Sequence, residues 1–349
     1  MLKFERVPYN PEWWESTLQQ FPDRNLYQSA PWLDFLAETQ GGEIITAALL
    51  DGNSRVGYFS GVLVRKFGLR LLGSPLPGWT TIYMGFNLMP GVPRWLAFQA
   101  LERFAFRDLG CHHFEVADRY ATAEDGKRAG LEQRFFNTYW TDLTKPEQNL
   151  FDELDPSYRR CIRKAKRCGV VVEEAIGDDA FAFEFYEHVK DVFRTKGLSP
   201  MYPRDWVTSF IHHLYPTDHL ALFRAREPEG KCVAACISHG MNGFAQLWGT
   251  ASLRKYQHLR PNQAMHWQAV LSWRNRGAQC FDWGGDGEYK KQYASQKITV
   301  HRFCKSSMPF LSRLRDCARA ALIQQKRVHG WWENSAAHKL FVSPAKHPQ

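Results

Sequence analysis

The hydrophobic and polar positions of this chain follow two different patterns, and the pattern changes several times along the sequence. Short runs rich in β-branched and aromatic residues predict strands, whereas apolar residues three and four positions apart predict amphipathic helices. In the first half, strands are expected at residues 43–50, 55–66, 112–116 and 135–143, and helices at residues 31–39 and 95–109. Asp51-Gly52-Asn53-Ser54 separates the first two strands and is typical of a hairpin turn.

The second half carries longer helical patterns and three consecutive strands. Helices are expected at residues 155–169, 180–195, 205–214 and 262–276, and strands at residues 170–174, 220–225, 232–239, 244–250, 279–283 and 298–304. Helices followed by a three-stranded meander, a further helix and a further strand predict an α/β, or α+β, layer around one mixed sheet.

The segment at residues 73–93 fits neither pattern. It is rich in Gly and Pro and also contains Trp79, Tyr83 and Phe86. A connection of this length is either functional, such as a lid, or a loop packed by its own side chains. The sequence leaves both interpretations open.

Composition and charge narrow the class of protein. The chain has 349 residues, of which 44% are hydrophobic and 23% charged, so a packed core and more than one ordinary domain are expected. The formal net charge is +9. Six Lys and Arg side chains lie within residues 159–167, and residues 301–349 are also basic, so the remainder is acidic. Such local patches favour a polyanionic partner over general nucleic-acid coating.

Other features favour a cytoplasmic protein. The N-terminal residues contain early charges and prolines but no apolar stretch typical of a signal peptide, and no run approaches the length of a transmembrane helix. The eight cysteines form no C-x-x-C pair and are interpreted as reduced structural thiols. Adjacent histidine pairs such as His112-His113 point to different faces of regular structure, so no metal site is expected.

The basic helix at residues 155–169 has clear ends. Asp155 is a good N-cap, Pro156 fits the first helical position, and Gly169 fits the position after the end. Tyr158 falls on the expected core face, whereas the six cations form two neighbouring stripes that repel each other. An anionic ligand, such as a diphosphate or a nucleic-acid backbone, would offset this repulsion. A purely solvated face is the alternative.

The second candidate segment follows the helix at residues 262–276. The strand Gln279 to Trp283 is followed by Gly284 and Gly285, and glycines just after a strand allow close approach of a ligand to the backbone. Lys290 and Lys291 come next, and a lysine there would stabilise an oxyanion or hold a phosphate. A flexible loop with a solvated lysine pair is the alternative.

Together these segments resemble a known family. Tyr158-Arg159-Arg160-x-x-Arg163-Lys164, the stretch from Pro261-Asn262 to Phe281-Asp282-Trp283-Gly284-Gly285, and Tyr289-Lys290-Lys291-x-Tyr293 resemble, in order and spacing, motifs of the FemAB-like branch of the GNAT acyltransferase superfamily. This branch includes BioF2-like (CelD-like) predicted acetyltransferases and the Fem peptidoglycan bridge ligases. Two departures are Ala294, where the family has glycine, and the lack of room between Val170 and Leu220 for the helical hairpin that some Fem ligases insert.

The resemblance implies two tandem GNAT-like domains, each a mixed, mainly antiparallel sheet flanked by helices. We expect them at residues 1–145 and 146–305, followed by a basic helical extension at residues 306–349. It also implies a catalytic role for Lys290, at the tetrahedral intermediate, and for Asp282. The implied substrate-binding residues are Tyr158, Arg159, Arg163, Lys164, Trp248, Tyr256, Asn262, Trp283, Gly284, Gly285 and Lys291, with Arg159, Arg163 and Lys164 holding acceptor phosphate and Tyr256 lining the acceptor channel.

The resemblance implies transfer of an acyl or aminoacyl group to an amine, without a resident cofactor. Residues 252–261 contain no glycine where other GNAT enzymes place a glycine-rich pyrophosphate loop, which disfavours acyl-CoA as donor. We therefore expect transfer from aminoacyl-tRNA to a small-molecule, peptide or precursor amine, with acyl-CoA-dependent N-acyl transfer as the alternative. A non-catalytic RNA- or precursor-binding protein is the second alternative. The basic extension would contact tRNA, with peripheral membrane contact as another interpretation.

Overall fold

The computed structural model of the chain describes residues 1–195 and 197–308, and within them the strands join into one thirteen-stranded sheet. The predicted extension at residues 306–349 falls almost wholly outside the described residues. The strands are β1 (Lys3–Val7), β2 (Glu43–Asp51), β3 (Ser54–Lys66), β4 (Leu69–Ser74), β5 (Phe86–Leu88), β6 (His113–Val116), β7 (Glu132–Asp142), β8 (Val171–Glu174), β9 (Leu220–Arg226), β10 (Cys232–Met241), β11 (Phe244–Ser252), β12 (Cys280–Asp282) and β13 (Gln296–Ser306).

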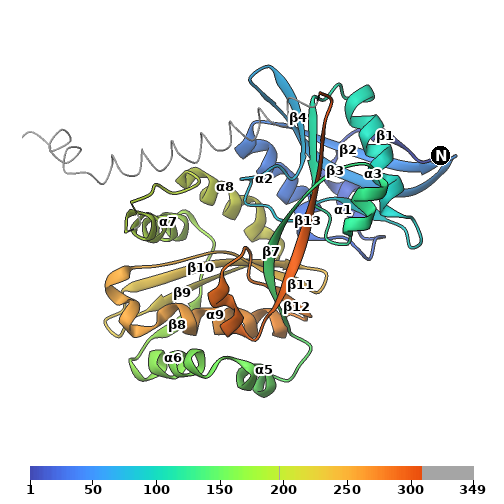
Figure 1. Cartoon of the computed structure of the whole chain (residues 1–349). Helices are drawn as coiled ribbons and strands as arrows, with labels where there is room; N and C mark the ends of the chain where they lie inside the picture. Colours follow the sequence, from blue (N-terminus) through green and yellow to red (C-terminus); the bar gives the residue numbers. More distant parts are fainter. Residues whose placement is uncertain (196, 309–349) are drawn as a thin grey trace, which may run out of the picture.

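Helices cover the sheet on both sides, so the fold is mixed α/β with a mainly antiparallel sheet, as predicted (Figure 1). They are α1 (Pro11–Leu18), α2 (Ala30–Gln40), α3 (Arg94–Arg103), α4 (Ala123–Arg128), α5 (Glu147–Glu153), α6 (Pro156–Arg167), α7 (Asp179–Arg194), α8 (Arg204–Leu214) and α9 (Pro261–Asn275). Short helical turns are η1 (Leu26–Gln28), η2 (Phe104–Asp108), η3 (Tyr215–Thr217), η4 (Arg254–Leu259) and η5 (Glu288–Tyr293). In the second half, α7 and α8 lie on one face, and α5, α6 and α9 on the other.

The sheet consists of two similar halves that exchange their last strands. In the first half β4 and β6 are parallel neighbours, and in the second half β11 and β12 are. The strand that follows each pair crosses to the other half: β7 pairs with β12, and β13 pairs with β6. β7 and β13 also pair with each other, which joins the halves into one sheet. The sheet therefore runs through the predicted boundary at residue 145, and the domain boundaries themselves stay a prediction.

The two halves also share a hydrophobic core. Helix α2 of the first half packs against α8 of the second, where the Trp32 and Phe210 rings lie 5.3 Å apart, edge to face. Both side chains are fully buried, and an aromatic pair of this geometry adds about 0.5–1.5 kcal/mol to the burial of its apolar area. The halves are therefore held by side-chain packing as well as by strand pairing.

The helix that carries the six cations has the predicted ends. The Asp155 carboxylate accepts a hydrogen bond from the Ser157 N–H at 2.8 Å, Pro156 is the first helical residue, and Gly169 follows the end with φ +73°. Tyr158 faces inward and is buried, also as predicted, and Ala165 is buried beside it on the same helix.

Candidate active site

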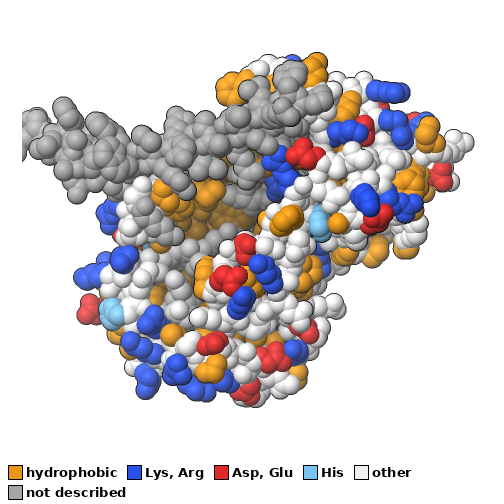
Figure 2. All heavy atoms as spheres, viewed as in Figure 1, with side chains coloured by type: hydrophobic (Ala, Val, Ile, Leu, Met, Phe, Trp, Pro, Cys, Tyr) orange, Lys and Arg blue, Asp and Glu red, His pale blue; other side chains and the backbone are white. Residues whose placement is uncertain are grey.

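The candidate site is a cavity of about 670 Å³ where the two halves meet. Figure 2 shows hydrophobic side chains in the hollow between the halves. The lining residues come from the segment at 77–82, from β7, β11 and β13, and from the segment after β12. The predicted site residues among them are Trp248, Trp283, Gly284, Gly285 and Lys290.

The cavity opens where two parallel strands separate. β11 and β12 pair only from Phe244 opposite Cys280 to Gln246 opposite Asp282. β11 then continues to Ser252, and its register against β10 shifts by one residue beside Trp248, which is a β-bulge. Beyond Gln246 the edge of β11 that faced β12 has no paired strand among the described residues, and this edge lines the cavity.

The first half closes the equivalent space with its own chain. β4 and β6 separate after Ser74 and Val116, but Met84 N–H donates to the carbonyl of Ala117 at 2.9 Å and Gly85 N–H donates to Ser74 Oγ at 3.0 Å. The loop at residues 73–93 is thus packed, with Trp79, Tyr83 and Phe86 buried, and its residues 77–82 also form one wall of the cavity. The interpretation as a loop packed by its own side chains is therefore confirmed, and a functional role for the segment stays a prediction.

Gly284 allows the chain to turn closely beside β11. Its φ is +62°, in the left-handed region that favours glycine, and a Cβ at this position would lie 3.2 Å from the carbonyl oxygen of Leu247. The turn that follows carries Lys290 back toward the strand ends.

Lys290 is fixed inside this turn, although lysines are rarely buried. The side chain is only 8% exposed, and its Nζ donates to the carbonyls of Trp283 at 2.9 Å and Gly285 at 3.2 Å. An ammonium has three N–H donors, so these two bonds hold the group while a third N–H can meet a ligand in the cavity. Burial lowers the pKa of Lys290, and the nearby Asp282 and Asp286 carboxylates oppose that shift.

Asp282 lies behind the cavity and does not line it. Its Oδ1 accepts hydrogen bonds from Thr138 Oγ1 and, at 2.7 Å, from Gly284 N–H. Its Oδ2 accepts from Tyr83 Oη at 2.8 Å and Trp140 Nε1 at 3.0 Å. Burial raises the pKa of Asp282, and these hydrogen bonds counteract the shift. The predicted catalytic role stays a prediction, while the contacts describe a side chain that joins both halves and positions the turn at Gly284.

We expect Asp282→Asn to destabilise the protein by about 1–3 kcal/mol, despite removing a buried charge. Gly284 N–H and Trp140 Nε1–H are fixed donors, one on each carboxylate oxygen. Whichever way the asparagine amide is turned, its NH2 group therefore faces a donor. The free energy of unfolding from urea titrations measures the effect. Asp286→Asn, in the same segment but exposed, is the matched control, and equal stability of the two variants would contradict this account.

His266 on α9 also lines the cavity, and the sequence prediction missed it. The side chain is buried, its Nδ1 lies 3.3 Å from Tyr158 Oη, and its Nε2 has no hydrogen-bond partner. The rings of Trp283 and Tyr293 pack against it, each with a centroid 5.6 Å away. Burial, and secondarily the charge of Lys290, lowers the pKa of His266 to about 3, so the imidazole is neutral. Tyr158, predicted to bind substrate, thus lies behind His266.

The remaining predicted binding residues do not line the cavity. Arg159 bonds the carbonyl of Asp152 at 2.8 Å, and Arg163 and Lys164 are exposed on α6. In the view of Figure 2, cations gather along the lower edge of the molecule, where Figure 1 places α6. Three further residues also lie outside the lining. The Tyr256 ring lies near the ammonium groups of Lys231 and Lys255. The Asn262 side-chain amide donates a hydrogen bond to Ser252 Oγ, and Lys291 forms an ion pair with Glu288. Their binding roles stay predictions.

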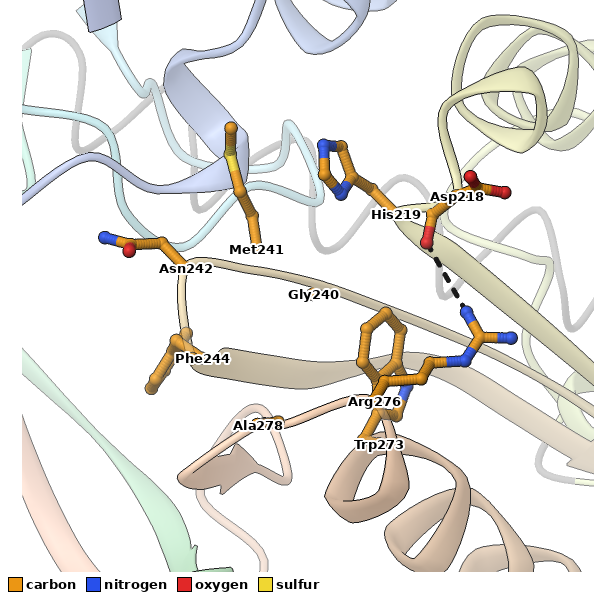
Figure 3. Close-up of a pocket in the computed structure, with 10 residues that line it drawn as sticks. Asp218, His219, Gly240, Met241, Asn242, Phe244, Trp273, Arg276 and Ala278 are labelled. Carbon is orange, nitrogen blue, oxygen red and sulfur yellow. Dashed lines mark hydrogen bonds between the residues drawn. The ribbon is translucent and has the colours of Figure 1, made fainter. Parts of the chain in front are cut away.

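A second cavity of about 510 Å³ lies at the hairpin between β10 and β11 (Figure 3). Arg276 lines this cavity. Its guanidinium donates to the carbonyls of Asp218 and Leu220, each at 3.4 Å, and forms an ion pair with Glu174. None of the predicted site residues lines this cavity. Among the described residues, no three His, Cys, Asp or Glu side chains are grouped to hold a metal ion, and no helix is long and apolar enough to cross a membrane.

Comparisons with known proteins agree with this geometry. Residues 156–292 match the acetyltransferase (GNAT) domain family, which spans α6, the meander, α9 and the Lys290 turn. No curated protein sequence matches the chain. The solved structure of FemX is similar at a TM-score of 0.66 and 14% identity, covering 85% of this chain and 96% of that one.

Two further solved structures share the fold. L-PGS from Bacillus licheniformis has a TM-score of 0.54 at 12% identity and covers 89% of this chain and 96% of its own. A conserved protein of unknown function from Bacteroides thetaiotaomicron has a TM-score of 0.52 at 11% identity and covers 87% and 99%. A GNAT domain in residues 156–292 and a fold similar to that of FemX are thus consistent with the resemblance to the FemAB-like GNAT branch.

Proposed function

We propose that this chain, which contains a GNAT acyltransferase domain and has a fold similar to that of FemX, is an aminoacyltransferase that joins an amino acid from aminoacyl-tRNA to an amine. The observation that carries the proposal is the buried Lys290 ammonium, fixed by two backbone carbonyls at the edge of the cavity. The Fem ligases that the sequence resembles use aminoacyl-tRNA donors.

The reaction needs charge stabilisation at one oxygen. The amine nitrogen attacks the ester carbonyl, the C–N bond forms, and the carbonyl oxygen becomes an oxyanion. In this proposal the third N–H of Lys290 donates to that oxygen, a contribution that grows as the negative charge develops. The C–O bond to the tRNA then breaks, and one amine proton ends on the released hydroxyl.

The amine must also be held with its lone pair toward the carbonyl. His266 lines the cavity, and its Nε2 is buried without a hydrogen-bond partner. In this proposal the imidazole carries its proton on Nδ1, beside Tyr158, and Nε2 accepts a hydrogen bond from an amine N–H. Because the imidazole is hard to protonate, its part is to orient the amine rather than to store its proton. The Trp248 and Tyr202 rings, which also line the cavity, offer π faces to the ammonium of an aminoacyl group.

The segment before α9 supports the proposed choice of donor. η4 and Arg260 occupy the place of a glycine-rich pyrophosphate loop, and Arg260 adopts φ +62° as the residue before the helix. The first helical residue is Pro261, which has no N–H to offer a phosphate. A pyrophosphate would therefore meet bulky side chains, whereas the exposed cations of α6 suit the backbone of a tRNA.

The test supplies the protein with radiolabelled aminoacyl-tRNAs or acyl-CoA and a panel of amines. We expect amide product from aminoacyl-tRNA and none from acyl-CoA. Donor affinity should also fall steeply as salt is raised, since each phosphate contact releases counterions. Amide formation from acyl-CoA alone would overturn the choice of donor.

A variant of α6 separates tRNA binding from chemistry. Replacing Arg160, Arg163 and Lys164 by glutamine should weaken tRNA binding and flatten its salt dependence, because these side chains are exposed and lie outside the cavity. The amine should bind as before. An unchanged salt slope would show that α6 does not contact the donor.

A further inference from the structure

Gln246 is a buried amide at the point where β11 and β12 separate. It is the last residue of β11 that pairs with β12, opposite Asp282, and it lines the candidate cavity although its side chain is only 2% exposed. A glutamine amide carries one acceptor oxygen and two N–H donors, and buried polar atoms of this kind normally have hydrogen-bond partners. The partners of Gln246 therefore show what its amide is free to do.

The amide oxygen of Gln246 is engaged, whereas the amide nitrogen is not. Oε1 accepts a hydrogen bond from Tyr27 Oη, and His239 Nε2 lies 3.4 Å from the same hydroxyl. Tyr27 belongs to η1 of the first half and is buried, so the contact fixes the amide from across the junction of the halves. Among the described residues Gln246 Nε2 has no hydrogen-bond partner, and it is not fully enclosed.

The unpartnered nitrogen borders the glycine turn that leads to Lys290. A Cβ at Gly284 would lie 3.5 Å from Gln246 Nε2, and a Cβ at Gly285 would lie 3.8 Å from Lys290 Nζ. The two nitrogens thus border consecutive glycines, and all four residues line the cavity. Asp282 does not serve as their acceptor, since both of its oxygens already accept hydrogen bonds from other donors. An oxygen atom of a ligand is the acceptor that this pair of donors lacks.

We propose that Gln246 is a second hydrogen-bond donor to the carbonyl oxygen that Lys290 stabilises, and that Tyr27 positions its amide. As the amine attacks, the C–N bond forms and the π electron pair of the carbonyl moves to the oxygen, where the Gln246 N–H donates without giving up its proton. When the bond to the leaving group breaks, the electron pair returns to the carbonyl. The role rests on the proposed function, because it requires attack on a carbonyl. It does not depend on the choice of donor, since an aminoacyl ester and an acyl-CoA thioester form the same oxyanion.

The first test is the rate of amide formation by Gln246→Met, which keeps the length of the side chain and removes both polar atoms. We expect kcat to fall about a hundredfold with a much smaller change in KM, as for loss of one oxyanion donor. Gln279→Met is the matched control, because Gln279 lies just before β12 but is exposed and outside the lining, and its kcat should stay near the unchanged value. A normal kcat in a folded Gln246→Met protein would overturn the proposal.

A double-variant comparison tests the positioning role of Tyr27. Tyr27→Phe leaves the Gln246 amide free to turn, and should lower kcat by a smaller factor, about tenfold. Once Gln246 is methionine there is no amide to position, so Tyr27→Phe should cause no further loss of kcat in the double variant. A merely structural role would instead multiply the two losses, and that result would reject Tyr27 as the positioning residue.

NMR of the unchanged protein gives a readout that needs neither turnover nor a folded variant. The glutamine side chains are isotope-labelled, and the probes are acetyl-CoA and a puromycin-type adenosine whose alanine is joined by a stable amide. We expect at least one probe to move the Gln246 NH2 protons downfield. Saturation with both probes that leaves these resonances unmoved would contradict the proposal.

The outcomes also separate this proposal from the proposed function. A downfield shift of the Gln246 NH2 protons without amide product from any amine would support Gln246 as a carbonyl donor and reject the aminoacyl transfer. Efficient aminoacyl transfer by Gln246→Met at the normal rate would support the proposed function and reject the role of Gln246.

Discussion

Replacing Lys290 with alanine is expected to lower kcat for amide formation by about a hundred- to a thousandfold, with a much smaller change in KM. The ammonium is held by two carbonyls before any substrate binds, so the enzyme does not have to reorganise as the oxyanion forms. The alanine variant loses that donor but keeps the cavity. The loss therefore appears in the chemical step, which single-turnover measurements with saturating donor isolate.

Two neighbouring variants make the Lys290 result specific. Lys297→Ala removes another lysine of the same region, exposed and outside the lining, and should leave kcat near the unchanged value. His266→Asn keeps a polar group beside Tyr158 but removes Nε2, the atom proposed to orient the amine, and should lower kcat by a smaller factor than Lys290→Ala. If Lys290→Ala transfers at the normal rate, its assigned role is wrong, and with it the observation on which the proposed function rests.

The sequence predicts the regular elements well where local signals agree. Asp155, Pro156 and Gly169 mark both ends of α6, and the helix expected at residues 180–195 forms as α7 and buries Phe181 and Phe185. The short strands β4 and β5 were not predicted. Their residues show no alternation of apolar and polar positions long enough to indicate a strand, and it is the pairing with β3 that makes them strands. The exchange of β7 and β13 could not be predicted, because the residue pattern of each strand is compatible with pairing in either half of the sheet.

The site shows the same limit. Lys290, Gly284 and Gly285 belong to one contiguous motif, so the sequence placed them together correctly. Arg134 and Arg302, which also line the cavity, are 168 positions apart and become neighbours only through the β7–β13 register. His266 lies within the stretch between Asn262 and Trp283 and was passed over because a lone histidine in a helix carries no local signal for a cavity. The basic stripe of α6 was conspicuous in sequence, yet it faces solvent outside the cavity.

Acidification from pH 7 to pH 5 is expected to lower the free energy of unfolding by about 2 kcal/mol for each of two buried histidines, His266 and His239. Burial lowers the pKa of His239 to about 3, with a further contribution from His219, and that of His266 to a similar value. In the unfolded chain both would titrate near 6.5. Between these limits the unfolded state binds more protons, so stability is full above about pH 6.5 and decreases as the pH falls toward 3.

His239 allows this to be tested away from the candidate active site. It packs in an aromatic cluster with Trp32 and Phe210, and its Nε2 lies 3.4 Å from Tyr27 Oη. The Tyr27 hydroxyl also donates to Gln246, so His239→Phe leaves that hydroxyl with a partner. The variant should reduce the pH dependence of stability by about 1 kcal/mol per pH unit between pH 6 and 5, because one titrating group has been removed.

Urea titrations across this pH range measure the slope directly. His258→Gln, at an exposed histidine, is the control for the loss of a histidine as such. Asp282 acts in the opposite direction, because a carboxyl whose pKa is raised in the folded state favours folding as the pH falls. The difference between the His239→Phe slope and the unchanged slope cancels this common contribution. An identical slope in both would mean that His239 gains its proton in the folded protein as readily as in the unfolded chain.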